Sequence, residues 1–335
     1  MRRITYMIII SLFMTVSCDI HFELKVQENG SSKIFACCTP GMADTTTIIV
    51  DIARYVNDKE SYDSSKFNID FYINGLKQEI LYNKNFYTSS AIKSGDMVTM
   101  EISYPGIENI YAQTQIPQEP CDPEFIIKMP ELDYSDIPDQ IRTEFILNYT
   151  DPDPNTYYAA IFKEKEHYTD YRVEWPEDKP VIVDTIESIT WNTMWIGADF
   201  DHLQSYPELT RNNMVNNNLV FWRNSDVSEV NERRTITFDL RYIKPDKIIP
   251  YYDDGVLNIS DFKDYSYEAT LYCITEELFN YYYTNLLQSN NGLSSSTMAQ
   301  KKPVFSNIEG GFGILGGMAG YSMIYDTNIT VEGWW

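Results

Sequence analysis

The chain has 335 residues, of which 43% are hydrophobic and 22% are charged, a balance typical of a folded globular protein. Its 49 Asp and Glu residues outnumber its 26 Lys and Arg residues, so the formal net charge at pH 7 is −23. This charge excludes binding to a nucleic-acid backbone, because phosphate contacts need a positive field. It also opposes adhesion to an anionic membrane surface. With only three histidines, the chain has little material for histidine-based catalysis or metal binding.

The first residues have the pattern of a secretion signal. Arg2 and Arg3 precede an apolar run at residues 6–16, which is too short to cross a bilayer as a helix. The run ends in a small residue before Cys18, which resembles a bacterial lipoprotein signal, although Thr15 stands where Leu is usual. We therefore predict that the signal is removed before Cys18 and that the sulfur of Cys18 is lipidated. The alternative is ordinary secretory cleavage near the same point.

The other four cysteines are Cys37, Cys38, Cys121 and Cys273. A disulfide from Cys37 or Cys38 to Cys121 is one alternative, and four free thiols are the other. The sequence favours free thiols, because nothing in it supports a bridge.

Alternation of apolar and polar residues with a period of two dominates the first third of the chain. The clearest run is 67–73, and it is followed by Asn74-Gly75, a dipeptide that favours a two-residue turn. Residues 76–82 are therefore predicted to return as the second strand of a hairpin. Similar runs at 48–52 and 98–104 predict further strands of a small antiparallel sandwich.

Beyond a proline-rich acidic stretch, the alternation resumes at 235–242 and 265–273. One helix is predicted at about 276–289, because Thr275 can cap it and apolar residues recur at every fourth position. Its predicted role is to cover the second sheet.

The predicted fold class is all-β and mostly antiparallel. It comprises an N-terminal Ig-like or transthyretin-like β-sandwich and a larger C-terminal β-sandwich or barrel-like domain that carries the helix. The predicted boundaries are a signal peptide at 1–17, a lipidated tether at 18–24, the N-terminal sandwich at 25–117, a linker at 118–138 and the C-terminal domain at 139–335.

Residues 311–316 match G-x-G-x-x-G letter for letter. A dinucleotide site of this pattern lies between a strand and a helix within βαβ units, and no such units surround Gly316. The glycines instead favour a bulged strand that passes close to other backbone.

Two acidic clusters fall short of a metal site. Residues 151–155 begin like an EF-hand loop, but the sixth and twelfth positions lack the required Gly and Glu, so we expect a tight turn. Asp199, Asp201 and His202 have no matching second cluster, and a solvated loop is the simpler interpretation. We therefore predict no metal site.

No G-x-S-x-G or H-E-x-x-H motif occurs, and the carboxylates are too many to single out a hydrolytic pair. We predict that the protein is not an enzyme, with no catalytic residue and no cofactor. Aromatic side chains that could stack on a ligand or line a groove are the remaining candidates for ligand binding: Trp191, Trp195, Trp222 and Tyr282. The alternative is that these rings belong to the core.

The most specific pattern is C-terminal. A Thr275-Glu276-Glu277 helix start and tyrosines at 281–283 precede the stretch PVFSNIEGGFGILG at 303–316. The stretch resembles the P-x-x-x-x-N-I-x-G-G-x-G-x-F-G pattern of the Bacteroidota lipoprotein family known as domain of unknown function 4249, with Leu315 in place of Phe. The signal ending at Cys18 resembles that family too, and the resemblance covers nearly the whole mature chain.

The resemblance implies an outer-membrane lipoprotein associated with a SusC-like TonB-dependent receptor, a β-barrel that imports nutrients. It implies a non-catalytic accessory at the cell surface, with the periplasmic face as the alternative, that captures a small-molecule, glycan or peptide ligand. Thr45 and Thr185 each follow an Asp, as in the O-glycosylation sequon of Bacteroidota envelope proteins. The alternative functions are a structural or adhesive surface lipoprotein and, less favoured, a hydrolase with unrecognised carboxylates.

Overall fold

The computed structural model describes residues 32–41, 45–53, 62–83, 85–128, 131–133, 140–150, 153, 155–174, 181–193, 195–198, 215–216, 219–223, 233–243, 248–253, 256–291 and 303–327. Within these ranges the chain is mostly β-strand, and its four sheets are antiparallel except for one strand pair. The same ranges contain one α-helix, α2 (Glu276–Asn291), and a 3-10 turn, η1 (Ser64–Lys66). The all-β prediction with a helix near 276–289 is therefore confirmed.

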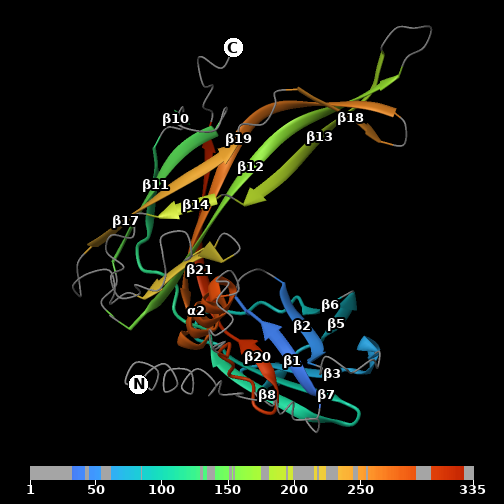
Figure 1. The fold of residues 1–335 in the computed structure, drawn as a ribbon, viewed down its shortest axis with the longest axis vertical. Coiled ribbons are helices and arrows are strands. Elements are labelled where there is room, and N and C mark those ends of the chain that lie inside the picture. The colour runs from blue at the N-terminus through green and yellow to red at the C-terminus, as the bar shows by residue number, and fades with distance from the viewer. Residues whose placement is uncertain are drawn as a thin grey trace, which may run out of the picture.

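The N-terminal part is a sandwich of two sheets, seen at the lower right of Figure 1. The β1 sheet has the strand order β20-β1-β2-β6-β5, and the β3 sheet has the order β4-β3-β7-β8. The strands are β1 (Lys33–Cys38), β2 (Thr46–Ala53), β3 (Asn68–Ile73), β4 (Leu76–Lys77), β5 (Leu81–Asn83), β6 (Asn85–Thr88), β7 (Met97–Tyr104), β8 (Ile107–Gln115) and β20 (Phe312–Leu315).

The predicted alternation builds the core of the sandwich, because every second side chain of a strand points to the same face. Ile34 and Ala36 of β1, Phe71 of β3 and Met100 of β7 are fully buried in one hydrophobic cluster. Burial of these side chains is the main force that holds the two sheets together.

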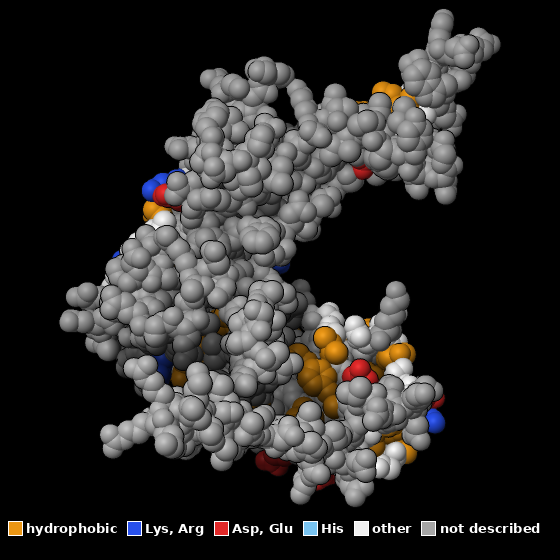
Figure 2. All heavy atoms as spheres, viewed as in Figure 1, with side chains coloured by type: hydrophobic (Ala, Val, Ile, Leu, Met, Phe, Trp, Pro, Cys, Tyr) orange, Lys and Arg blue, Asp and Glu red, His pale blue; other side chains and the backbone are white. Residues whose placement is uncertain are grey.

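The outer face of the β1 sheet is apolar and partly open. Phe312 and Ile49 are 50% and 48% exposed, and Leu81 of β5 is 41% exposed. Phe312 pairs with Phe35 and Ile49 pairs with Cys37, so these side chains share one face. Figure 2 shows hydrophobic side chains gathered on this part of the surface. Exposed apolar area of this kind is typical of a contact site.

The hairpin at Asn74-Gly75 is confirmed, but its second strand is shorter than predicted. Asn74 and Gly75 have φ angles of 51° and 78°, the left-handed pair of a two-residue hairpin turn. β4 pairs with β3 only briefly, and the chain then crosses to the β1 sheet, where β5 pairs with β6. A single strand over 76–82 is wrong, because residues 78–80 belong to no strand and Ile80 packs against the core between the sheets.

Two long antiparallel strands, β12 (Tyr157–Glu174) and β19 (Val256–Ile274), form the centre of the C-terminal part. On its other side β12 pairs first with β16 and then with β13, while β18 and β21 follow one another along β19. Figure 1 shows the far ends of these strands projecting as an arm away from the sandwich. The other strands of this sheet are β13 (Val181–Thr193), β15 (Val215–Asn216), β16 (Leu219–Arg223), β18 (Ile248–Asp253) and β21 (Met318–Thr327), of which β15 pairs with β16 alone.

A further sheet packs on this one through an aromatic core. Phe162 of β12 contacts Phe145 at 5.1 Å and Phe238 at 4.8 Å between ring centroids. Trp222 donates its indole N–H to the hydroxyl of Tyr149 at 3.0 Å within the same core. The strands of this sheet are β9 (Glu124–Ile127), β10 (Glu131–Asp133), β11 (Gln140–Thr150), β14 (Trp195–Ala198) and β17 (Arg233–Ile243).

Three strands pair outside the segment to which the sequence analysis assigned them. The range 118–138, predicted as a linker, contains β9 and β10, which both pair with β11. β20 comes from the range predicted as the C-terminal domain, yet it pairs in parallel with β1. The sandwich therefore includes a strand from the end of the chain.

The pattern of residues at 303–316 is explained by the contacts that its side chains and glycines make with backbone atoms. Asn307 holds Leu315 with both ends of its amide, since Oδ1 accepts the Leu315 N–H at 3.0 Å and Nδ2 donates to the Leu315 carbonyl at 2.9 Å. Ser306 Oγ accepts the N–H of Gly313 at 3.1 Å. Gly313 has φ +120°, and a Cβ there would overlap the carbonyl oxygen of Ala36. The predicted close approach of this glycine to other backbone is confirmed.

We expect Gly313→Ala to lower the free energy of unfolding by about 3 kcal/mol or more, because the added Cβ meets the Ala36 carbonyl at an unfavourable φ. Gly75→Ala is the matched control. Its φ of +78° is also positive, but nothing lies within 4 Å of the added Cβ, so only a backbone cost of about 1 kcal/mol remains. Urea unfolding followed by tryptophan fluorescence measures both losses. Equal losses would contradict the close approach.

Candidate functional site

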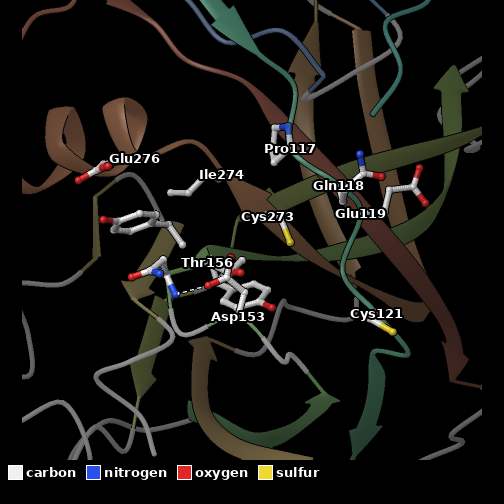
Figure 3. A pocket seen from close by; sticks show the side chains of 12 residues that line it. Pro117, Gln118, Glu119, Cys121, Asp153, Thr156, Cys273, Ile274 and Glu276 are labelled. Atoms are coloured by element: carbon white, nitrogen blue, oxygen red, sulfur yellow. Dashed lines mark hydrogen bonds between the residues drawn. The ribbon is translucent and has the colours of Figure 1, made fainter. Parts of the chain in front are cut away.

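A pocket of about 530 Å³ lies where the sandwich meets the C-terminal sheets, and Figure 3 shows it from close by. We call it the junction pocket. It is built by the chain that follows β8, the turn that precedes β12, and the end of β19 with the start of α2. Its lining residues are Pro117, Gln118, Glu119, Cys121, Asp153, Asn155, Thr156, Tyr157, Tyr158, Cys273, Ile274 and Glu276.

The turn before β12 places two tyrosines at this pocket. The carboxylate of Asp153 accepts the N–H of Asn155 at 2.8 Å, and the Asp153 carbonyl accepts the N–H of Thr156 at 3.3 Å. This is an Asx turn, so the expected tight turn is confirmed here. The ring of Tyr157 then packs on Phe279 of α2 at 4.8 Å.

The start of α2 forms another wall. Thr275 Oγ1 accepts the N–H of Leu278 at 3.4 Å, which confirms Thr275 as the helix cap. The N–H of Thr275 donates to the Gly317 carbonyl at 3.1 Å, so the helix start is fixed to the chain that joins β20 to β21. Glu276 and Glu277 follow in the first turn, where the positive end of the helix favours carboxylates.

The charge that lines the junction pocket is negative. Glu119, Asp153 and Glu276 come from three different segments, and none of the lining residues that the structure describes is Lys or Arg. Such a wall attracts cations and hydrogen-bond donors. Within the residues that the structure describes, no group of three His, Cys, Asp or Glu side chains is placed to hold a metal ion.

A second pocket of about 440 Å³ adjoins the first and shares Glu276 with it. We call it the helix-start pocket, because it lies between the end of β8 and the first turn of α2. Its lining residues are Met97, Gln113, Thr114, Gln115, Thr275, Glu276 and Glu277. We refer to the two pockets, which share Glu276, as the acidic groove.

Two cysteines line the junction pocket. Cys121 is exposed, Cys273 is buried, and both are free thiols, as are Cys37 and Cys38. The prediction of free thiols is confirmed for these four residues. Burial raises the pKa of the Cys37 and Cys38 thiols, so both remain protonated at neutral pH.

Of the four aromatic residues predicted to contact a ligand, the two whose side chains the structure describes, Trp222 and Tyr282, line neither pocket. Trp222 is fully buried, and Tyr282 is half-buried against Phe221, with 5.8 Å between ring centroids. Trp191 and Trp195 lie on β13 and β14, and their side chains are outside the described part of the chain.

The remaining predicted sites stay predictions. Cys18 and the segment 199–202 lie outside the described residues. Thr45 and Thr185 are both exposed, as a glycosylated side chain has to be. Thr185 lies on β13, where its N–H donates to the carboxylate of Asp184 at 2.8 Å.

The acidic groove was not predicted from the sequence. Glu119 lay in the predicted linker, Asp153 in a rejected calcium loop, and Glu276 in a helix start that looked purely structural. The available signal was the excess of acidic residues at three predicted segment boundaries, but nothing in the sequence placed those boundaries together.

The fold defines the class of this molecule: a mostly β protein in which the late strand β20 completes an N-terminal sandwich, with an acidic groove where the sandwich meets the C-terminal sheets. The chain belongs to the family described as Domain of unknown function (DUF4249), whose model matches residues 21–322. The family predicted from the sequence is thus confirmed. No curated protein matches the chain, and no solved structure matches it. In the part that the structure describes, no helix has the length and hydropathy needed to cross a membrane.

We expect Trp222→Phe to lower the free energy of unfolding by about 2–4 kcal/mol. The smaller ring leaves space in the core, and the hydroxyl of Tyr149 loses the indole donor at 3.0 Å. Urea unfolding of the Trp222→Phe, Tyr149→Phe and double variants measures the coupling between the two residues. Unchanged stability would contradict the placement of Trp222 in the core.

We expect Cys121 to react with a thiol reagent much faster than the three other described cysteines, because it alone among them is exposed. The measurement is the time course of reaction with 5,5′-dithiobis(2-nitrobenzoate) on protein that carries Cys18→Ser. Cys121→Ser should remove the fast phase, and Cys273→Ser should leave it. A fast phase that survives Cys121→Ser would contradict the assignment.

Proposed function

We propose that this protein is a lipid-anchored, non-catalytic binding component of the cell envelope, an accessory to an outer-membrane TonB-dependent nutrient receptor. The observation that carries the proposal is the junction pocket. Its volume of about 530 Å³ is in the range of small-molecule sites, and its walls combine carboxylates with tyrosines from separate segments. Elements fixed by backbone hydrogen bonds support these walls, as a preformed binding site requires.

Two further features support the proposal. The apolar run before Cys18 resembles the signal of an exported lipoprotein, and acyl chains on Cys18 would anchor the chain at a membrane. The open apolar face of the β1 sheet, with Ile49 and Phe312 about half exposed, suits contact with a partner protein such as a receptor.

A structural or adhesive surface protein is the second candidate, and the same apolar face favours it. Such a face can bind another envelope protein with no small ligand involved. A groove mutant that loses its ligand and keeps its partner protein would favour this second function.

The anchor is tested by changing Cys18. We expect the unchanged protein to fractionate with the outer membrane and to incorporate radiolabelled palmitate in cells, because acylation at Cys18 holds it there. Cys18→Ala should release it into the soluble fraction without label, while Cys121→Ala should remain membrane-bound and labelled. If the wild-type protein is soluble and carries no palmitate label, the proposed lipid anchor is wrong.

The receptor is tested by affinity purification of the tagged, membrane-bound protein from detergent extracts. The proposal expects a large β-barrel receptor to co-purify. Repeated isolation of the protein alone from cells that express such receptors would contradict the accessory role.

A further inference from the structure

We propose that β21 is a docking edge for an extended, positively charged segment of a partner polypeptide, which adds to the sheet as a further strand. The site is the side of β21 that faces away from β19, at residues 320–324. It shares no residue with the two pockets, so the inference goes beyond the proposed function and does not depend on it.

The first argument is the direction of the backbone groups. The N–H of Met318 donates to the Pro40 carbonyl at 2.9 Å and not to β19. Every second residue of an antiparallel strand directs its N–H and carbonyl groups to the same side. Those of Gly320, Ser322 and Ile324 therefore also point away from β19. In the part of the chain that the structure describes, no strand or backbone group pairs with these three residues on that side.

The second argument is that three other sheet edges carry a protection that β21 lacks. A free edge invites pairing with another chain, and proteins block it with proline, with charge or by occupying its N–H groups. At β20, the side chains of Ser306 and Asn307 accept backbone N–H groups of the strand. β18 contains Pro250, and on β13 the carboxylate of Asp184 accepts the N–H of Thr185.

β21 has none of these devices at residues 318–325. This part of the strand contains no charged residue and no proline, and its ladder with β19 runs without a bulge. Tyr321 and Ile324 are 41% and 63% exposed. They lie on opposite faces of the sheet, because side chains alternate along a strand. An added strand therefore gains apolar contacts on both faces as well as backbone hydrogen bonds.

The charge of the chain decides between possible partners. The formal net charge is −23, and β21 contains no Lys or Arg. Pairing with β21 of a second copy would bring together two molecules of the same strong negative charge, whereas a cationic segment is attracted. Since the bonds are made by the backbone, the segment needs only an extended conformation, side chains that favour a strand, and positive charge.

The test is fluorescence anisotropy of the labelled peptide KTVTITVK with the full mature chain carrying Cys18→Ser. We expect this peptide to bind. The same peptide N-methylated at its two central residues should not bind, because adjacent residues direct their N–H groups to opposite edges and both edges are then blocked. The uncharged peptide QTVTITVQ should bind more weakly, because it is not attracted by the negative charge of the protein.

Ser322→Pro tests the edge itself. It removes an N–H that β19 does not use, so the ladder should persist, while the affinity for KTVTITVK should fall about tenfold or more. Ser322→Ala is the matched control. It loses the same hydroxyl contact with Thr270 at 2.8 Å but keeps the N–H, so it should leave the affinity unchanged. Thermal unfolding checks that both variants are folded.

A second variant does not depend on the tolerance of β21 for proline. Ile324→Lys places a positive charge at an exposed position of the edge, so it should weaken binding of the cationic peptide several-fold. Ile182→Lys is its matched control. Ile182 is 57% exposed on β13, and the same substitution there changes the net charge equally but should leave the affinity unchanged.

Four results would overturn the inference. The first two are no binding of KTVTITVK and equal affinity for its N-methylated form. The third is an affinity that both Ser322→Pro and Ile324→Lys leave unchanged. The fourth is another occupant of the edge. A dimer in sedimentation that Ser322→Pro dissociates would assign the edge to a second copy, and tighter peptide binding by a chain that ends at Thr327 would assign it to residues 328–335.

Discussion

The parallel pairing of β20 with β1 is the contact on which the rest of the arrangement depends. It is possible only because Gly313 lets the two backbones approach closely. Beyond the pair, the N–H of Gly316 donates to the Cys38 carbonyl at 3.1 Å, and the N–H of Met318 donates to the Pro40 carbonyl at 2.9 Å. The same few residues also abut α2, where a Cβ on Gly316 would lie 2.6 Å from Leu278 Cβ. One short segment therefore fixes the sandwich against the C-terminal sheets, and the groove lies between them.

The distribution of charge connects the whole chain with the groove. A formal net charge of −23 disfavours the approach of anions, and Glu119, Asp153 and Glu276 bring negative charge from separate segments to the junction pocket. Electrostatic repulsion between these carboxylates is partly offset at α2, because Glu276 and Glu277 lie at the positive end of the helix. A helix start that looks like simple capping in the sequence thus also supplies charge to a pocket wall.

Local patterns predicted the local structure well. The strands at 48–52, 67–73 and 98–104 could be predicted because alternating burial follows from the types of adjacent residues. α2 could be predicted because its cap and its apolar stripe lie within one segment. The break after Lys77 was missed, since crossing between sheets is decided by which partner strand is near and not by the propensity of residues 76–82.

The groove could not be predicted for the same reason. Its lining comes from segments that lie far apart in the chain and meet only through tertiary packing. Trp222, one of the predicted ligand contacts, is held in the core by Tyr149, and residue type alone does not distinguish a ring that stacks on a ligand from one that fills a core. The close approach of Gly311 and Gly313 to other backbone was predicted correctly, because a glycine-rich strand without surrounding βαβ units favours such packing.

The order of synthesis gives the β1–β20 pair a further consequence. Lys33 and Gly310, which meet beside this pair, are separated by 277 residues, so the ribosome makes one partner near the beginning of translation and the other near its end. Until then β1 has no neighbour on one side, and the sandwich stays incomplete. The N-terminal sandwich can therefore be completed only after residues 312–315 of β20 have been made, although all its other strands lie within the first 115 residues.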